Sequence, residues 1–572
     1  MQLNKEILEE KNWKVKKICV VGPGIVGMPM AALLADAKIM IGNGKPAEIV
    51  VIQRNSKFSG WKVNAINSGK SIIGGIEPEL DQIVSESVEN GLLRASHSTD
   101  ELADADVILI CVQTDKKGFA PDYGPLFEAL EGVAKALQKK PKGKLPLIIF
   151  ESTLAPSTMS TLIKSFFEKN NLIEGKDVLL GNSPNRVMPG RLVERVVTSD
   201  KLVAGLNGTT PVRIYELYKN IVKKGRLFQT NSLTAEVVKT LENAYRDVRI
   251  AFAAEIVRYC DDNNINFYEL RDKVNECINQ SDEASINPNA VPTGGLLIPT
   301  IGVGGHCLPK DGILLWWRRI EKQVDTSYSL ILNSRKINDA SPSESIKLAE
   351  KYFGILDNKC VALLGTAYRF NSEDTRNSPT LSTAKHLLDK GCKIKIHDPF
   401  VKPDDQNLLK NNLEQYFTRD LKVALSDAEF VFICTGHKYY IDEIDIIKNS
   451  FPKIKGIFDG CNIYKQNDFK DSNIVYTGIG RGLENPEQSF IDFVVRCFKI
   501  VEKGLANEVL SVVNFLNNYY ADGEFNKIKF SEVQKLAASC STGCIIADAG
   551  SVESIQAFKD FLPVLVECAV KS

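Results

Sequence analysis

The feature that most constrains the fold is a glycine turn near the start of the chain. Residues 16–35 read KKICVVGPGIVGMPMAALLA, a β-branched run followed by a turn and a helical apolar pattern. Gly22, Gly24 and Gly27 have the GxGxxG spacing. The first glycine permits a tight turn, the second lets backbone approach a pyrophosphate, and the third lets the helix pack on the strand. With its flanking strand and helix, the turn predicts a dinucleotide-binding domain; a glycine turn without a ligand is the alternative.

Strand and helix patterns then alternate along the first part of the chain. Strands are predicted within EIVVIQRN (48–55), ADVILICVQT (105–114) and LPLIIFEST (145–153), with helical stretches between them such as 124–139. Such alternation is typical of a parallel sheet wound by right-handed crossovers. Two further runs, DVLLGNSPNRV (177–187) and KLVAGL (201–206), extend the predicted sheet to about residue 210.

The middle of the chain is helical, and a second sheet pattern follows it. Residues 231–281 are predicted to be helical from an N-cap at Ser232 or Thr234, and about 310–353 is also helical. The strand pattern returns in the runs KCVALLGTAY (359–368), CKIKIHDP (392–399), AEFVFICTGH (428–437) and GIFDGCNIY (456–464).

We therefore expect an α/β protein with two Rossmann-like parallel-sheet domains joined by a long central helix, plus a C-terminal extension. The expected parts are an NAD-binding domain (14–225), a central helical and dimerisation region with a cysteine loop (226–353), a second Rossmann-like domain (354–490) and an unassigned extension (491–572).

The second predicted strand bears on the choice of dinucleotide. An acidic residue is usual at its end, where it binds the ribose hydroxyls, but here the chain reads Gln53-Arg54-Asn55. Gln53 can still hydrogen-bond a hydroxyl, whereas Arg54 would meet a 2′-phosphate or stand on the surface. NAD is the predicted cofactor, with NADP as the alternative.

Composition limits the classes of partner and compartment. Lys plus Arg and Asp plus Glu are equal at 71 each, which gives no electrostatic reason to expect nucleic acid or an anionic membrane. No apolar run reaches membrane-spanning length. Thirteen cysteines are scattered without metal-like CxxC pairs, which favours free thiols, no metal site and a reducing cytoplasm.

The run GVGGHCLPKD (302–311) is the second informative motif. Positive charge and free backbone N–H groups favour a reactive thiolate, so Lys310 and the glycines indicate a nucleophile at Cys307. Asp311 is placed to hold or activate a water, while His306 is interpreted as a loop residue. The alternative is a buried structural cysteine. A thiol beside a dinucleotide suits oxidation of an aldehyde to an acid through a thiohemiacetal and a thioester.

From about residue 15 to 485 the motifs, in order, resemble the UDP-glucose/GDP-mannose dehydrogenase family of NAD-dependent nucleotide-sugar 6-dehydrogenases. Besides the glycine turn and the cysteine loop, the matching segments are FESTLAPST (150–158), EVVKTLENAYRDVRIAFAAE (236–255), GTAYRFNSEDTRNSP (365–379) and GIGR (478–481).

The resemblance implies a four-electron oxidation of the sugar C6 alcohol to a carboxylate, with two NAD molecules reduced. It implies Cys307 as nucleophile, Asp311 and Thr153 for the hydrolytic water, and Lys239 and Asn243 at the reacting end of the sugar. The implied cofactor-binding residues are Gly22, Gly24, Ile25, Val26, Gly27, Gln53, Arg54, Thr114, Thr153 and Arg376. The implied substrate-binding residues are Asn185, Arg186, Val187, Lys239, Asn243, Gly304, Tyr368, Arg369 and Arg481.

Several positions depart from the family pattern. Asn185 stands where a glutamate linked to acid–base assistance is expected, and an amide cannot accept a proton at neutral pH. Arg369 replaces a lysine, and Cys461 stands where arginine is frequent. With Gln53, these departures indicate an outlying subfamily. The SPxRxxPG form, with Arg186 and Pro189, favours the branch acting on UDP-N-acetylhexosamines over the glucose branch.

Two other functions fit parts of the pattern. A two-electron hydroxyacid dehydrogenase of the 6-phosphogluconate type would use Lys239 and Asn243 but not Cys307, and the departures would suit a catalytically weak sugar-nucleotide-binding protein. The helix predicted at 234–260 is apolar around much of its circumference, which indicates either a homodimer or higher homo-oligomer, or burial within one chain.

Overall fold

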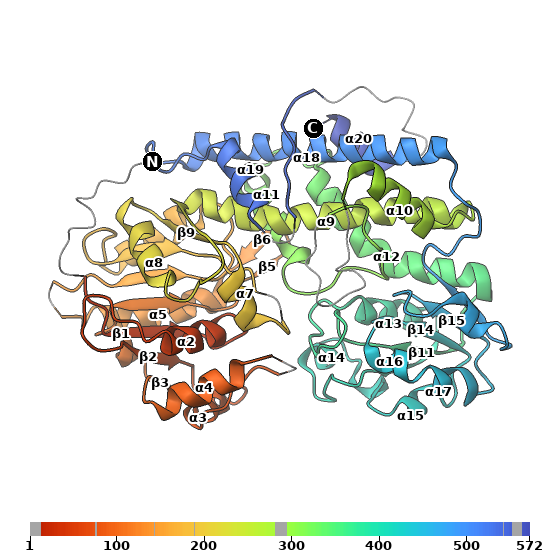
Figure 1. Ribbon diagram of the computed structural model, residues 1–572, viewed down its shortest axis with the longest axis horizontal. Coiled ribbons are helices and arrows are strands. Elements are labelled where there is room, and N and C mark those ends of the chain that lie inside the picture. The colour runs from red at the N-terminus through yellow and green to blue at the C-terminus, as the bar shows by residue number, and fades with distance from the viewer. Residues whose placement is uncertain are drawn as a thin grey trace. The chain divides into compact units, whose positions relative to one another are not determined.

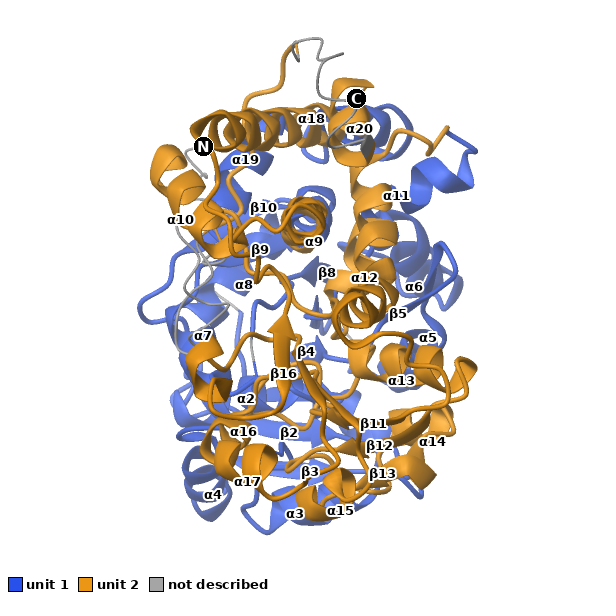
Figure 2. Cartoon of the chain, turned by 90° about the vertical axis from the view of Figure 1, so that its right-hand side faces the viewer, with its two compact units in different colours: residues 1–242, 314–324, 510–541 blue, residues 243–313, 325–509, 542–572 orange. Residues whose placement is uncertain are grey.

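The computed structural model describes residues 13–74, 77–141, 143–187, 189–280, 294–540, 543–551 and 563–571. The chain divides into two compact units (Figure 2). Unit 1 comprises residues 1–242, 314–324 and 510–541, and unit 2 comprises residues 243–313, 325–509 and 542–572. Three helices have residues in both units: α9 (Ser232–Asp262), α11 (Leu308–Glu321) and α18 (Gln488–Tyr520).

Unit 1 is built on an eight-stranded sheet with the order β10-β9-β8-β7-β4-β1-β2-β3. Figure 1 labels its strands β1, β2, β3 and β9. Its strands are β1 (Lys17–Val21), β2 (Glu48–Ile52), β3 (Leu93–Ser96), β4 (Val107–Ile110), β7 (Leu147–Phe150), β8 (Leu179–Asn182), β9 (Lys201–Gly205) and β10 (Leu227–Asn231). All neighbours are parallel except β8 and β9, which are antiparallel. The sheet thus extends one strand beyond residue 210.

Helices cover both faces of this sheet because its strands are apolar on both sides. Ile18 and Val20 of β1 pack with α2 (Gly27–Asp36), α4 (Leu80–Glu89), α7 (Leu192–Thr198) and α8 (Thr209–Tyr218). Cys19 and Val21 face the other way, toward α5 (Gly124–Leu137) and α6 (Lys164–Lys169). The remaining elements are α3 (Trp61–Asn67), the β5 (Asp115–Lys117) and β6 (Ala120–Asp122) hairpin, the single turns η1 (Thr99–Leu102) and η2 (Met159–Ile163), and α19 (Phe530–Ala538).

Unit 2 contains a six-stranded parallel sheet with the order β13-β12-β11-β14-β15-β16. Its strands are β11 (Cys360–Leu364), β12 (Lys393–His397), β13 (Phe417–Thr418), β14 (Phe430–Ile433), β15 (Gly456–Asp459) and β16 (Val475–Gly478). Its helices are α10 (Phe267–Ile278), α12 (Leu330–Phe353), α13 (Pro379–Asp389), α14 (Gln406–Lys410), α15 (Leu421–Leu425), α16 (Lys438–Asp442), α17 (Ile444–Asn449) and α20 (Pro563–Lys571), with single turns η3 (Glu414–Tyr416) and η4 (Gln466–Phe469). Two α/β sheets and a long α9 confirm the expected fold class.

In the second sheet, the residue after the second strand is acidic, whereas the first sheet has Gln53 there. Its carboxylate binds backbone N–H groups of the same domain. Asp398 follows β12 and is fully buried. Its Oδ2 accepts the N–H groups of Thr366 and Ala367, and its Oδ1 accepts those of Phe400 and Val401. This carboxylate therefore holds the β11 turn together instead of reaching toward a ribose.

Helix α9 begins after β10, and its N-cap differs from the one expected. The side chain of Asn231 accepts the N–H of Thr234 at 2.7 Å, so Asn231 is the cap and Ser232 and Thr234 lie inside the helix. The sequence pattern does not indicate Asn231 as the cap, because this residue also ends a strand.

Part of the apolar circumference of α9 is covered by the chain's own α18. Within unit 2, Phe252 and Phe498 lie 5.8 Å apart between ring centroids, and the guanidinium of Arg249 lies 4.1 Å from the Phe498 ring. Glu502 accepts hydrogen bonds from Tyr245 and Arg249 at 2.9 and 2.6 Å. Burial within one chain thus accounts for much of the pattern, and the homodimer stays a prediction. Over the described ranges, no helix has the length and hydropathy for a membrane crossing.

Candidate active site

The glycine turn of unit 1 has the geometry that a pyrophosphate needs. Gly22 has φ +91°, and a Cβ on Gly27 would lie 2.2 Å from the carbonyl oxygen of Gly22. A Cβ on Gly24 would meet nothing within 4 Å, so the turn is open on that side. In the described part of the chain, the amides of Ile25 and Val26 have no hydrogen-bond acceptor. These amides at the start of α2 are therefore free to bind phosphate oxygens.

The side chains that follow β2 favour NAD over NADP. Gln53 donates to the Ser59 hydroxyl at 2.9 Å, which leaves its carbonyl oxygen for a ribose hydroxyl. Nη1 of Arg54 lies 2.6 and 2.7 Å from the two carboxylate oxygens of Glu128. A 2′-phosphate would have to displace this carboxylate, so the surface interpretation of Arg54 is the one that the geometry supports.

This arrangement predicts that Glu128→Ala makes the enzyme more tolerant of NADP. Without the carboxylate, Arg54 can bind a 2′-phosphate, and we expect kcat/KM with NADP to rise roughly tenfold. The value with NAD is expected to change little, since NAD lacks that phosphate. Initial rates with each dinucleotide test this, with Glu131→Ala, an exposed change one turn along α5, as the control. Equal NADP rates in the two variants would contradict the role given to Arg54.

The loop after Thr153 is held against the first turns of α9. The backbone carbonyl of Thr153 accepts the Thr114 hydroxyl at 2.7 Å. Farther along the loop, the N–H groups of Ser157 and Met159 donate to the two carboxylate oxygens of Glu236 at 2.7 and 2.8 Å. Burial raises the pKa of Glu236 to about 8. The sequence pattern did not reveal this anchor, because a glutamate in a helical run is usually exposed.

Asn185 lies beside a buried carboxylate that was also not anticipated. Its amide donates to Oε2 of Glu151 at 3.0 Å, and Glu151 is paired with Lys201 at 2.8 Å and with the Tyr218 hydroxyl. The Glu151 side chain is 0% exposed. Glu151 therefore orients Asn185. Its position directly after β7, at the carboxyl end of a parallel strand, was the available signal.

In unit 2, Cys307 is exposed and stands immediately before α11. Its carbonyl oxygen accepts the N–H groups of Lys310 and Asp311 at 3.1 and 2.9 Å, so the cysteine caps the helix. Its backbone thus lies at the positive end of the helix dipole, which favours negative charge nearby. Exposure contradicts the alternative of a buried structural cysteine.

Asp311 is the centre of a buried polar cluster. Its two carboxylate oxygens lie 2.6 Å from the Asn243 amide nitrogen and 2.6 Å from the Lys310 ammonium. Asp311 is 0% exposed and Lys310 is 2% exposed. The carboxylate thus orients Asn243 on α9, and its expected work on the hydrolytic water stays a prediction.

The glycines of the cysteine loop allow close packing against the segment 365–379 of the same unit. A Cβ on Gly304 would lie 2.5 Å from Cβ of Tyr368 and 2.9 Å from the Asn377 carbonyl. Gly305, with φ +88°, donates its N–H to the Arg376 carbonyl at 2.8 Å and accepts the Asn377 amide at 2.9 Å. Burial raises the pKa of Tyr368 to about 12, so its phenol stays protonated. The loop that carries Cys307 is therefore fixed on the second domain.

Gly304→Ala is expected to displace the loop that carries Cys307. The added methyl group has no room beside Tyr368, and a shift of about 1 Å at a reacting group costs on the order of a hundredfold in kcat. The rate of cofactor reduction with the best nucleotide sugar tests this. Gly44→Ala is the control, because a Cβ there meets nothing within 4 Å. Unchanged kcat in Gly304→Ala would show that loop position does not matter.

The other predicted substrate residues are distributed over the two units. Lys239 (8% exposed), Arg186 and Val187 belong to unit 1, and Arg369 and Arg481 belong to unit 2. The Arg369 guanidinium lies 5.2 Å from the Phe370 ring. Arg481 donates from Nε to Asn462 and from Nη2 to the Tyr464 carbonyl, both at 2.8 Å. Nη1 of Arg481 has no acceptor among the described residues and is available to a ligand.

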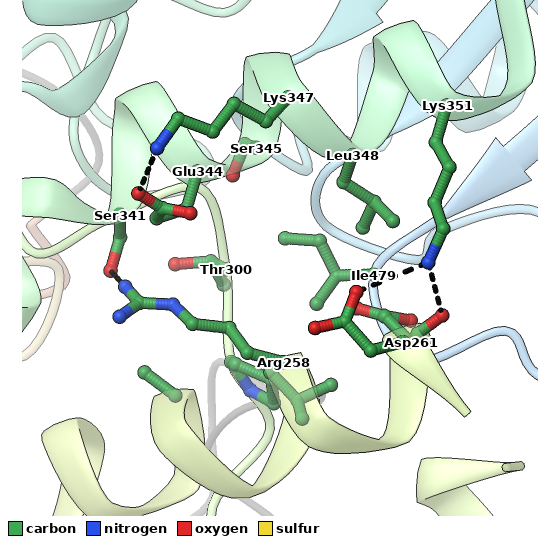
Figure 3. A pocket seen from close by; sticks show the side chains of 14 residues that line it. Arg258, Asp261, Thr300, Ser341, Glu344, Ser345, Lys347, Leu348, Lys351 and Ile479 are labelled. Atoms are coloured by element: carbon green, nitrogen blue, oxygen red, sulfur yellow. Dashed lines mark hydrogen bonds and ion pairs between the residues drawn. The ribbon is translucent and has the colours of Figure 1, made fainter. Parts of the chain in front are cut away.

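A cavity of about 210 Å³ in unit 2 lies between α9 and α12 (Figure 3). Its charged groups are largely satisfied, since Lys347 pairs with Glu344 at 2.8 Å and Lys351 with Asp262 at 3.1 Å. None of the described residues that line it is a predicted site residue. The cavity therefore contributes nothing to the assignment of the site.

Comparison with known proteins agrees with this geometry. Three models of the UDP-glucose/GDP-mannose dehydrogenase family match: the NAD binding domain at residues 16–222, the central domain at 233–340 and the UDP binding domain at 362–466. The UDP-N-acetyl-D-mannosamine dehydrogenase of Pyrococcus horikoshii is 31% identical over 473 residues, covering 82% of this chain and 99% of the relative.

Solved structures give the same result. An NDP-N-acetyl-D-galactosaminuronic acid dehydrogenase from Methanosarcina mazei superposes with a TM-score of 0.67 at 30% identity, over 84% of this chain and 98% of the other. The P. horikoshii UDP-D-ManNAc dehydrogenase also has a TM-score of 0.67 at 30% identity, over 82% and 99%. The resemblance predicted from the motifs is confirmed, and the chain belongs to the UDP-glucose/GDP-mannose dehydrogenase family of NAD-dependent UDP-sugar dehydrogenases.

Proposed function

We propose that the protein oxidises the C6 hydroxyl of a UDP-N-acetylhexosamine to the uronic acid, with two NAD molecules reduced per sugar. The observation that carries this proposal is the exposed Cys307 at the start of α11, in a glycine loop packed on the domain that matches the UDP binding model. Relatives named as UDP-N-acetyl-D-mannosamine dehydrogenases make that sugar the first to test.

The reaction assigns a separate role to each group. Bound NAD supplies the hydride acceptor for both oxidations. Lys239 and Asn243, four residues apart on α9, lie on one helix face and hold the oxygen on C6 as its proton and a hydride leave. The Cys307 thiolate then forms a bond to the aldehyde carbon, and Asn243 and Lys239 stabilise the oxyanion of the thiohemiacetal.

Loss of a second hydride leaves a thioester on Cys307. A water held by Thr153 and Asp311 attacks the carbonyl carbon, the carbon–sulfur bond breaks and the thiolate is restored. Overall, the alcohol, one water and two NAD⁺ give the carboxylate, two NADH and three protons. Asn185 cannot act as a base in this step, so Asp311 is the only carboxylate in the proposed set.

The decisive experiment is a panel of UDP- and GDP-sugars assayed for NADH absorbance, with the products identified by mass spectrometry. We expect UDP-N-acetylmannosamine or another UDP-N-acetylhexosamine to give two NADH per uronate. One NADH per sugar would favour the two-electron dehydrogenase, and none with any sugar would favour a binding protein. UDP-glucose as the preferred substrate would overturn the branch assignment.

The proposal includes the domain limits 14–225, 226–353, 354–490 and 491–572, a homodimer and a cytoplasmic location. The dimer has a direct test, because light scattering of the purified protein gives its mass. A mass of one 63.4 kDa chain would contradict the dimer and would fit the intrachain cover that α18 provides for α9.

A further inference from the structure

The C-terminal extension lies beyond the matched domains, yet part of it is built into unit 1. The family models end at residue 466, whereas residues 510–541 belong to unit 1 together with the NAD-binding sheet. This segment comprises the end of α18, a connection and α19 (Figure 2). Val533, Leu536 and Ala537 of α19 are buried, so the segment is packed and not a loose tail.

The connection before α19 orients the cap of the central helix. Asn231 caps α9 through its side-chain oxygen, and its amide nitrogen donates to the carbonyls of Phe525 and Lys527 at 3.0 and 3.1 Å. The hydroxyl of Thr230 donates to Glu532 at 2.8 Å. The last two residues of β10, directly before α9, are thus hydrogen-bonded to the extension.

Residues at the end of α19 accept hydrogen bonds from Arg186. Nε of Arg186 donates to Glu242 at 3.3 Å, and Nη2 donates to Glu242 and, at 3.3 Å, to the Leu536 carbonyl. Nη1 donates to the Asp200 carbonyl at 2.8 Å and to the Ser539 hydroxyl at 3.2 Å. A helix C-terminus favours a cation, so the end of α19 suits this guanidinium.

These contacts change the role expected of Arg186. Its side chain is 6% exposed and its five N–H groups are accounted for within the protein, so it has none left for a sugar. Its partner Glu242 stands on α9 between Lys239 and Asn243. The Arg186–Glu242 ion pair therefore connects the segment 183–187 to the part of α9 that carries Lys239 and Asn243. The end of α19 supplies further hydrogen-bond acceptors for Arg186.

We infer that the C-terminal extension is a positioning element for the reaction: Ser539 and the end of α19 hold Arg186, and through it the segment 183–187 and the residues of α9 that face the sugar. The inference rests on the proposed function for its kinetic consequence. The extension then supports turnover through hydrogen bonds within unit 1.

The test compares Ser539→Ala with Ser531→Ala, an exposed serine of α19, in the full-length protein. Loss of one hydrogen bond to a charged group is expected to lower kcat about fivefold. KM for NAD is expected to stay within about twofold, because the glycine turn is untouched. Ser539→Thr keeps the hydroxyl and is expected to restore kcat. An unchanged kcat in Ser539→Ala would overturn the inference.

A double-mutant cycle separates positioning from general support. If Ser539 acts through Arg186, Ser539→Ala has no further effect on kcat in an Arg186→Lys background. The same fivefold loss in both backgrounds would overturn the inference. Amide hydrogen exchange can be measured without a substrate. Faster exchange at residues 183–187 in Ser539→Ala than in Ser531→Ala supports the contact even if the protein oxidises none of the sugars tested. Equal exchange would overturn the inference whether or not the proposed function holds.

Discussion

Cys307→Ser is expected to abolish uronate formation while the protein folds and binds NAD normally. The side chain is exposed at the start of α11, so exchanging sulfur for oxygen creates no cavity and leaves no buried group unpaired. A serine hydroxyl is a far weaker nucleophile than a thiolate unless a base activates it. We expect the rate of acid formation to fall by at least about a thousandfold.

The measurement is the uronate formed per unit time, by mass spectrometry, alongside NADH absorbance. Cys277→Ser is the matched control, because Cys277 is also an exposed free cysteine of unit 2 outside the loop. Its activity is expected to equal that of the wild type. Undiminished uronate production by Cys307→Ser would rule out the covalent route, even if the two-NADH stoichiometry held.

The dinucleotide turn and the core strands could be predicted from the sequence because their determinants are local. The roles of Gly22 and Gly27 follow from spacing alone, and the structure shows the positive φ and the missing room for a Cβ. The central strands are continuous apolar runs because helices cover both faces of a parallel sheet. The two-residue β13 has no such pattern and was not predicted.

The supporting contacts of the site could not be predicted because they join residues far apart in the chain. Glu151, directly after β7, meets Lys201 at the start of β9, which runs antiparallel to β8, and Arg186 meets Ser539 in the extension. A charged residue in a strand or helix is usually exposed, so nothing local distinguishes these buried ones. The motif indicates Asp311, but it does not predict that this side chain is buried or that it accepts a hydrogen bond from Asn243.

Lys201→Met is expected to lower the free energy of unfolding of unit 1 by roughly 3–5 kcal/mol. The Lys201 ammonium lies 2.8 Å from the Glu151 carboxylate, and the two side chains are 6% and 0% exposed. Burial lowers the pKa of Lys201, and Glu151 opposes that shift. Methionine fills similar space, so the expected loss comes from the carboxylate left buried without its cation. The midpoint of urea unfolding, followed by circular dichroism, measures the change.

Two further variants distinguish an unpaired charge from a packing defect. Lys453→Met breaks the pair with Asp427, whose side chains are 62% and 77% exposed, and is expected to leave the free energy of unfolding almost unchanged. Adding Glu151→Gln to Lys201→Met removes the unpaired charge, while the new amide can still accept from the Tyr218 hydroxyl. The double variant is therefore expected to be more stable than Lys201→Met alone. If it is less stable, the cost of Lys201→Met comes from lost packing and not from an uncompensated charge.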